Sequence, residues 1–144
     1  MSIVSIATGA GRGMGRACAE RLAATSDVLV AVDRDEVALG DALTTLRATA
    51  ATVVPVTLDV TDVAALGALA DQVRDLGDLG GVAHAAGISP TMADWRQVMQ
   101  VDLVGTARLV EALTPLVTTG TAMVCFASMA AHLMPADPAA DAVL

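Results

Sequence analysis

A glycine-rich turn is the part of this sequence whose residue types and spacing point most directly to chemistry. Residues 8–15 read Thr-Gly-Ala-Gly-Arg-Gly-Met-Gly, between an apolar run and a helix-forming stretch. Gly9 permits a tight turn from strand to helix, Gly13 lets the backbone approach a pyrophosphate, and Gly15 lets the helix pack closely on the strand. The N–H groups at the start of that helix would then bind phosphate.

A carboxylate follows the turn at a matching distance. Asp33 ends the apolar run 28–32, where a dinucleotide site needs an acceptor for the hydroxyls of the adenosine ribose. The two features together predict binding of NAD or NADP. The Asp33 carboxylate would repel a 2′-phosphate, which favours NAD, whereas Arg12 and Arg34 favour NADP, so NADP stays as the alternative.

Alternating strand and helix patterns place these residues. They predict an α/β fold with a doubly wound parallel sheet over residues 1–134, followed by a Pro/Ala/Asp-rich tail over 135–144. The strands are expected at about 2–7, 27–33, 52–57, 79–84 and 121–127, and the helices at about 14–24, 36–49, 62–76 and 94–117.

Composition agrees with this fold and excludes one class of partner. Apolar residues make up 55% of the 144 residues and aromatic residues only 1%, as in parallel strands that are buried on both faces. The formal net charge of −8 argues against nucleic acid as a partner, because a phosphate backbone requires clustered basic residues.

Two further patterns bear on location. Cys18 and Cys125 fall in a helix and in a strand expected to be buried, so we expect free core thiols in a reducing cytoplasm and no disulfide. The N-terminus lacks the basic region of a signal peptide. The uncharged stretch 112–131 is broken by Pro115 and Gly120, which favours a helix end, a turn and a strand over a membrane span.

The spacing Thr-Gly-x-x-x-Gly-x-Gly resembles the short-chain dehydrogenase/reductase family. Further motifs of that family follow in order over essentially the whole chain: Leu58-Asp59-Val60, His84-Ala85-Ala86-Gly87, the stretch 101–106 and Ser128. The resemblance implies a Rossmann-like sheet with strand order 3-2-1-4-5, without the family's C-terminal strands and helices.

The resemblance also implies a set of cofactor-binding residues. Asp59 and Val60 would flank the adenine, and the loop after the fourth strand would approach the nicotinamide ribose. His84 replaces an asparagine that ties neighbouring strands together, and we interpret it as structural, with a catalytic role as the alternative. The full expected set is Gly9, Arg12, Gly13, Met14, Gly15, Asp33, Arg34, Asp59, Val60, Ala85, Ala86 and Gly87.

Two residues match catalytic positions of the family. Ser128 would hydrogen-bond and polarise a substrate carbonyl. Asp102 replaces an asparagine of the family's proton relay; it keeps an acceptor and loses the amide donor. The family's proton donor is a tyrosine activated by a lysine, yet this chain contains no tyrosine, and all eight of its basic residues are arginine.

The expected function is therefore NAD(P)-dependent hydride transfer between a nicotinamide and a small hydrophobic alcohol or ketone. The sequence after Ser128 resembles a subgroup related to 3α-hydroxysteroid dehydrogenase/carbonyl reductase, whose members carry an insertion before the tyrosine. On that basis the chain would be the N-terminal half of a dehydrogenase, and its catalytic activity without the tyrosine and lysine would be weak or absent.

The alternative is a non-catalytic module for dinucleotide binding or association. The apolar strand expected at 121–127 would lie at the edge of the sheet, where open hydrogen-bonding groups favour pairing with another chain. Self-association is expected in either case.

Overall fold

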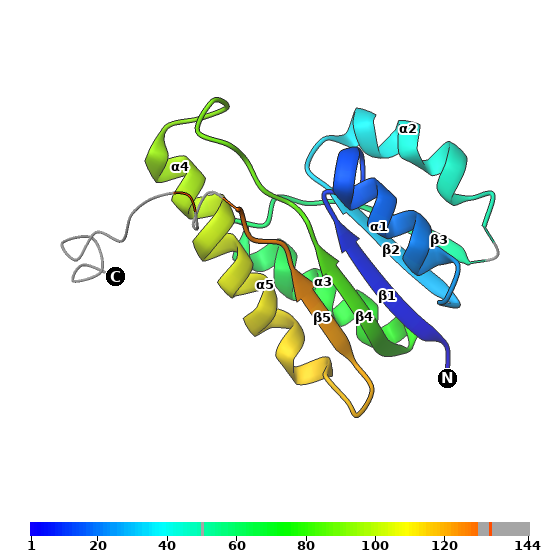
Figure 1. The fold of residues 1–144 in the computed structure, drawn as a ribbon. Helices are drawn as coiled ribbons and strands as arrows, with labels where there is room; N and C mark the ends of the chain where they lie inside the picture. The colour runs from blue at the N-terminus through cyan, green and yellow to red at the C-terminus, as the bar shows by residue number, and fades with distance from the viewer. Residues whose placement is uncertain (50, 130–132, 134–144) are drawn as a thin grey trace.

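Strands and helices alternate along the chain in the computed structural model, which describes residues 1–49, 51–129 and 133 (Figure 1). The expected tail over 135–144 lies outside the described residues. The elements in chain order are β1 (Ile3–Thr8), α1 (Gly13–Ala23), β2 (Val28–Asp33), α2 (Glu36–Leu46), β3 (Thr52–Thr57), α3 (Val63–Leu76), β4 (Asp78–His84), α4 (Trp95–Met99), the π-helical turn η1 (Gln100–Gly105), α5 (Thr106–Leu113), the 3₁₀ turn η2 (Thr114–Leu116) and β5 (Ala122–Cys125).

The strands form one parallel sheet in the order β3-β2-β1-β4-β5, which confirms the expected Rossmann-like topology. β1 lies in the middle, where Ile6 pairs with Val30 of β2 and with Val82 of β4. The order reverses between β1 and β4, because the chain runs outward to β3 and then crosses back. In sheets of this kind, ligands bind outside the carboxyl ends of the strands at that reversal.

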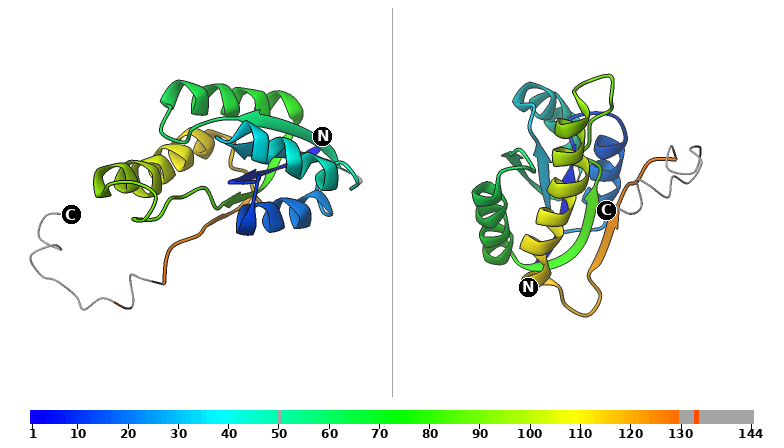
Figure 2. Two further views of the ribbon diagram at one scale, coloured as in Figure 1. Left: turned by 90° about the horizontal axis from the view of Figure 1, so that it is seen from above. Right: turned by 90° about the vertical axis from the view of Figure 1, so that its left-hand side faces the viewer.

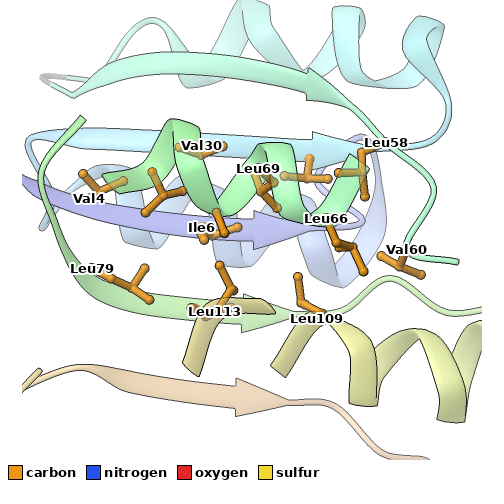
Figure 3. Close-up of a cluster of buried hydrophobic side chains, with 14 of the residues drawn as sticks. Val4, Ile6, Val30, Leu58, Val60, Leu66, Leu69, Leu79, Leu109 and Leu113 are labelled. Atoms are coloured by element: carbon orange, nitrogen blue, oxygen red, sulfur yellow. The ribbon is translucent and has the colours of Figure 1, made fainter. Parts of the chain in front are cut away.

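Side chains alternate between two cores, one on each face of the sheet. Val4, Ile6 and Val30 point to the face covered by α3 and α5, and they are fully buried there (Figure 3). Leu29 and Ala31 point to the opposite face, which α1 and α2 cover. Figure 2 shows α3 and α5 on the opposite side of the sheet from α1. Both faces of β2 are therefore covered, as its unbroken apolar run predicts.

The long helix expected over 94–117 is interrupted. The π-helical turn η1 separates α4 from α5, and η2 follows α5. A Cβ at Gly105 would lie 2.9 Å from a methyl group of Val60, so the absence of a side chain lets η1 pack closely on the loop after β3. Single π-turns of this kind occur frequently at functional sites.

The edge strand β5 differs from the expectation of a buried strand. Cys125, predicted to be a core thiol, is exposed, because it is the last residue of a strand that has a neighbour on one side only. On the α1 side, β5 borders an open groove of about 490 Å³, and Val124 in this groove is 54% exposed. Cys18, the other expected core thiol, is only partly buried in α1. Among the described helices, none is long and apolar enough to cross a bilayer.

Candidate dinucleotide-binding site

A cavity of about 370 Å³ opens at the carboxyl ends of β1, β2 and β4, where the strand order reverses. Every residue that the sequence assigns to the cofactor lines it. These are Gly9, Arg12, Gly13, Met14, Gly15, Asp33, Arg34, Asp59, Val60, Ala85, Ala86 and Gly87. The structure thus gathers four separate chain segments, within 9–15, 33–34, 59–60 and 85–87, around one space.

The glycine turn forms the floor of this cavity at the start of α1. Gly9 and Gly13 have φ angles of 68° and 54°, a left-handed conformation that side chains disfavour. A Cβ at Gly15 would clash with the carbonyl oxygen of Gly9 and lie 2.8 Å from that of Thr8. The N-cap residue Arg12 makes no side-chain capping bond, so the first N–H groups of α1, whose residues 13–15 line the cavity, have no capping acceptor from that side chain. This geometry fits a pyrophosphate.

Asp33 is held in a fixed orientation at the end of β2. It is 9% exposed, and its Oδ2 accepts a hydrogen bond of 2.8 Å from the N–H of Gly11. Its Oδ1 accepts a bond of 2.9 Å from the N–H of Asp35. An ionised carboxylate has about four acceptor positions. Each oxygen therefore keeps capacity for a hydroxyl on the cavity side, which is what a ribose diol requires.

Charges of both signs surround the mouth of the cavity. Arg12 forms an ion pair with Asp35, which caps α2. The N–H of Ala38 at the start of α2 lowers the pKa of Asp35, and Arg12 lowers it further. Bonds from the N–H and hydroxyl of Thr61 lower the pKa of Asp59, with a smaller contribution from the charge of Arg34. Both carboxylates are therefore ionised at neutral pH.

The loop that follows β4 is fixed from two sides. On one side, Thr8 Oγ1 accepts a hydrogen bond of 3.1 Å from the N–H of Ala86. On the other, Asp102 Oδ1 accepts a bond of 2.9 Å from the N–H of Ile88. Asp102 thus holds the backbone of this loop through its carboxylate.

The two residues with expected catalytic roles do not share the cavity. Neither Ser128 nor Asp102 is among the described residues that line it. Ser128 is exposed and follows β5, whose end lies beside β4, since the N–H of Phe126 donates to the carbonyl oxygen of His84. The structure therefore assembles the cofactor residues more completely than the catalytic pair.

His84 makes the strand-tying contacts that we expected of it. Its Nδ1 lies 2.7 Å from Thr8 Oγ1 and its Nε2 lies 2.9 Å from Thr106 Oγ1. The ring is 2% exposed. Burial lowers the pKa of His84, while the charge of Asp102 acts in the opposite direction. The imidazole therefore stays neutral to lower pH than an exposed one.

Some residues of the site were missed by reasoning from the sequence. Thr8 opens the glycine turn and Thr106 ends the stretch 101–106, but the sequence assigns no role to their hydroxyls. Only the three-dimensional contacts with His84 give these hydroxyls a role. Asp35 could have been found, because an aspartate just before an apolar helical pattern is a typical N-cap. Its pairing with Arg12 depends on tertiary structure.

Comparison with known proteins agrees with this geometry. A sequence profile described as short chain dehydrogenase matches residues 3–139. The short-chain reductase protein NovJ of Streptomyces niveus is 35% identical over 113 residues, which are 73% of this chain and 43% of that protein. The structure of an NAD⁺-bound xylitol dehydrogenase matches with a TM-score of 0.81 and 27% identity, over 96% of this chain and 57% of the other.

A third match carries the other dinucleotide. It is the complex of Pseudomonas aeruginosa RhlG with NADP, with a TM-score of 0.66 and 28% identity over 78% of this chain and 45% of the other. The chain thus spans about half the length of these relatives. The order of the strands, the glycine turn and the sequence match lead to one conclusion: this chain belongs to the short-chain dehydrogenase/reductase family.

Proposed function

We propose that this chain forms the dinucleotide-binding part of an NAD(P)-dependent oxidoreductase that transfers hydride between a nicotinamide and an alcohol or ketone. The observation that carries the proposal is the cavity at the carboxyl ends of β1, β2 and β4, lined by the glycine turn, Asp33 and the loop after β4. Solved relatives that bind NAD or NADP support it.

NAD is the dinucleotide that the charges favour. The Asp33 carboxylate, held by the N–H groups of Gly11 and Asp35, would accept the ribose hydroxyls and repel a 2′-phosphate. Arg12, one of the two basic residues of the cavity that would attract that phosphate, is paired with Asp35, whereas Arg34 would still favour NADP. The 2′-phosphate of NADP would have to compete with Asp35 for Arg12. This competition adds to the repulsion by Asp33.

The chain's own residues would divide the work as follows. The start of α1 would hold the pyrophosphate, Asp59 and Val60 would border the adenine, and the backbone of Ala85 to Gly87 would approach the nicotinamide ribose; all of these residues line the cavity. When bound, the nicotinamide supplies or accepts the hydride. Ser128 would polarise the substrate carbonyl from the end of β5. The proposed substrate is a hydrophobic carbonyl compound, as in the hydroxysteroid dehydrogenase/carbonyl reductase subgroup.

The 144 residues hold no tyrosine or lysine to supply the proton. Loss of a positioned general acid commonly costs about a hundredfold or more in rate. We therefore expect this chain by itself to bind the dinucleotide and to turn over substrate very weakly.

Calorimetric titration with NADH and NADPH tests the proposal. We expect saturable binding with NADH preferred, and an Asp33→Asn variant that binds NADH about tenfold more weakly, because a charge-assisted hydrogen bond is worth about 1.5 to 3 kcal/mol. The same variant should lose most of the preference over NADPH. Unchanged affinity for both in Asp33→Asn would reject Asp33 as the ribose ligand.

Asp35→Asn sharpens the test from the other side of the cavity. It keeps the size of the side chain and removes the charge that pairs with Arg12. We expect NADPH to bind about threefold more tightly, since an exposed ion pair contributes about 0.2 to 1 kcal/mol, while NADH affinity changes little. Weaker binding of both dinucleotides would show that the Arg12 pairing instead shapes the site.

A second candidate function is association through β5. The groove beside β5 is lined by apolar groups that include Leu22, Val82, Val124 and Phe126. An edge strand of this kind favours pairing with another chain. Sedimentation over a range of concentrations separates the candidates: a folded chain that self-associates and binds neither dinucleotide would be an association module.

A further inference from the structure

His84 lies at the centre of a chain of hydrogen bonds that links the loop after β4 to η1. Its two ring nitrogens contact the hydroxyls of Thr8 and Thr106. The Thr8 hydroxyl also accepts from the N–H of Ala86, and the Thr106 hydroxyl donates to the carbonyl oxygen of Asp102 at 2.7 Å. Three side chains therefore connect two backbone groups from different parts of the fold.

The direction of every bond follows from the two ends. The carbonyl oxygen of Asp102 only accepts, so the Thr106 proton points to it, and the Thr106 oxygen is left to accept from His84 Nε2–H. At the other end, the N–H of Ala86 only donates. The Thr8 oxygen accepts this bond, and because a neutral ring with its proton on Nε2 has an acceptor at Nδ1, the Thr8 proton is donated to His84 Nδ1. One protonation state of the ring satisfies both partners.

The other states of the ring leave a buried group unsatisfied. Protonation of Nδ1 would place two donors against the Thr8 oxygen and leave the Thr8 proton without an acceptor among these groups, in a side chain that is 0% exposed. An unsatisfied buried donor costs about 1 to 3 kcal/mol. The lowered pKa of His84 agrees with a neutral ring.

We propose that His84, as the neutral Nε2–H tautomer, is a positioning residue that fixes the nicotinamide-side loop through a one-way chain of hydrogen bonds from Ala86 N–H to the Asp102 carbonyl. Its role in cofactor binding rests on the proposed function. The loop packs closely on the glycine turn, because a Cβ at Gly9 would lie 3.0 Å from the nitrogen of Ala86. A displaced loop would therefore alter the glycine turn as well.

Nitrogen-15 NMR of the imidazole tests the tautomer without any ligand. The chain has two histidines, so a His132→Gln variant leaves His84 as the single ring signal. We expect a protonated Nε2 and an unprotonated Nδ1 at neutral pH. A protonated Nδ1, in either the other tautomer or the imidazolium, would overturn the proposed chain of bonds.

Amide hydrogen exchange at Ala86 tests positioning, again without a ligand. Thr106→Val removes the link, and Thr114→Val is a matched control, since Thr114 also donates to a carbonyl four residues back, at 2.7 Å, but has no bond to His84 among the described contacts. We expect Ala86 exchange to rise about tenfold in Thr106→Val and in His84→Leu, and not in Thr114→Val. Equal exchange in Thr106→Val and Thr114→Val would overturn the proposal.

Rescue and cofactor affinity complete the test. His84→Asn supplies an NH2 donor group and a carbonyl acceptor, so we expect it to recover most of the Ala86 protection that His84→Leu loses. NADH affinity should follow the same order, with about a tenfold loss for His84→Leu and less than about threefold for His84→Asn. If the wild-type chain shows the expected tautomer and Ala86 protection but does not bind NADH, the proposed function is rejected and the positioning role of His84 is not. Failure of His84→Asn to protect Ala86 better than His84→Leu would reject the positioning role.

Discussion

Strands β2 and β5 have similar apolar compositions but different surroundings. Every residue of β2 is buried, because strands lie on both sides and helices cover both faces. Most of β5 is exposed, because it lies at an edge and borders an open groove. The difference also appears at the ends of the two strands: Asp33 is held by two backbone N–H groups within a cavity, whereas Ser128 lies on the surface.

This contrast indicates which part of the site the described chain completes. The proposed cofactor site lies at the centre of the sheet, where β2, β1 and β4 pair along their lengths. Ser128, the proposed carbonyl-polarising residue, follows a short edge strand. Sites on strands and helices are positioned more precisely than sites on loops, and Ser128 lies in the segment after β5, so we expect dinucleotide binding to be the stronger property of this chain.

The largest expected effect comes from truncating the two strands in the same way. Leu29→Ala in β2 removes a fully buried side chain, and we expect unfolding free energy to fall by about 3 kcal/mol. Val124→Ala in β5 removes a side chain that is 54% exposed and should change it by less than about 0.5 kcal/mol. Urea unfolding followed by circular dichroism measures both. Similar losses would show that β5 is packed as firmly as β2.

A smaller loss of stability is expected from a substitution in the glycine turn. In Gly15→Ala the new methyl group meets the backbone carbonyls of Thr8 and Gly9, which cannot rotate away as a side chain would. We expect about 2 kcal/mol of lost stability and loss of NADH binding. Gly67→Ala in α3 is the matched control, since open space surrounds Gly67, and it should be neutral or stabilising by up to about 1 kcal/mol. Normal NADH affinity in Gly15→Ala would contradict the proposed phosphate site.

The smallest expected effect is the change of folding stability with pH that comes from His84 at the centre of the sheet. Burial lowers the folded pKa of His84, and Asp102 partly opposes the shift, so the unfolded chain binds this proton more readily. Stability from a neutral His84 is full above its unfolded pKa of about 6.5 and decreases as pH falls toward the folded pKa, by at most about 1.4 kcal/mol per pH unit. Urea unfolding between pH 7.5 and 5 measures it.

His84→Asn provides the control, because the amide does not titrate and should remove most of this slope. Asp35 and Asp59 do not interfere in that range. Their folded pKa values are lowered from 3.8, so their contributions are present above this pH and are lost only in stronger acid. Equal slopes in the wild type and His84→Asn would show that the buried imidazole has no role in the acid response.

Local patterns in the sequence predicted much of the fold. The β2 run is apolar at every position before Asp33, and this pattern correctly indicates a strand covered on both faces. The glycines between β1 and α1 likewise predicted the turn. Both the apolar run and the glycine spacing are local patterns, because they depend only on neighbours along the chain. The expected strand order also agrees with the structure.

Features that depend on distant residues could not be predicted in this way. Cys125 follows apolar residues, as a buried strand residue would, but its exposure depends on how many strands and helices surround β5. The π-turn at η1 interrupts a stretch with a helical pattern, and its close packing depends on Val60 in another loop. The network of Thr8, His84 and Thr106 joins three segments far apart in the sequence.

Chemical-shift mapping of backbone amides during NADH addition tests the central contrast most directly. We expect shifts concentrated at Gly9, Gly13, Asp33 and Ala86, and little change at Val124, because the cofactor cavity and the groove beside β5 are separate sites. Shifts concentrated at β5, or no shifts in a folded chain at saturating NADH, would contradict a dinucleotide site at the centre of the sheet.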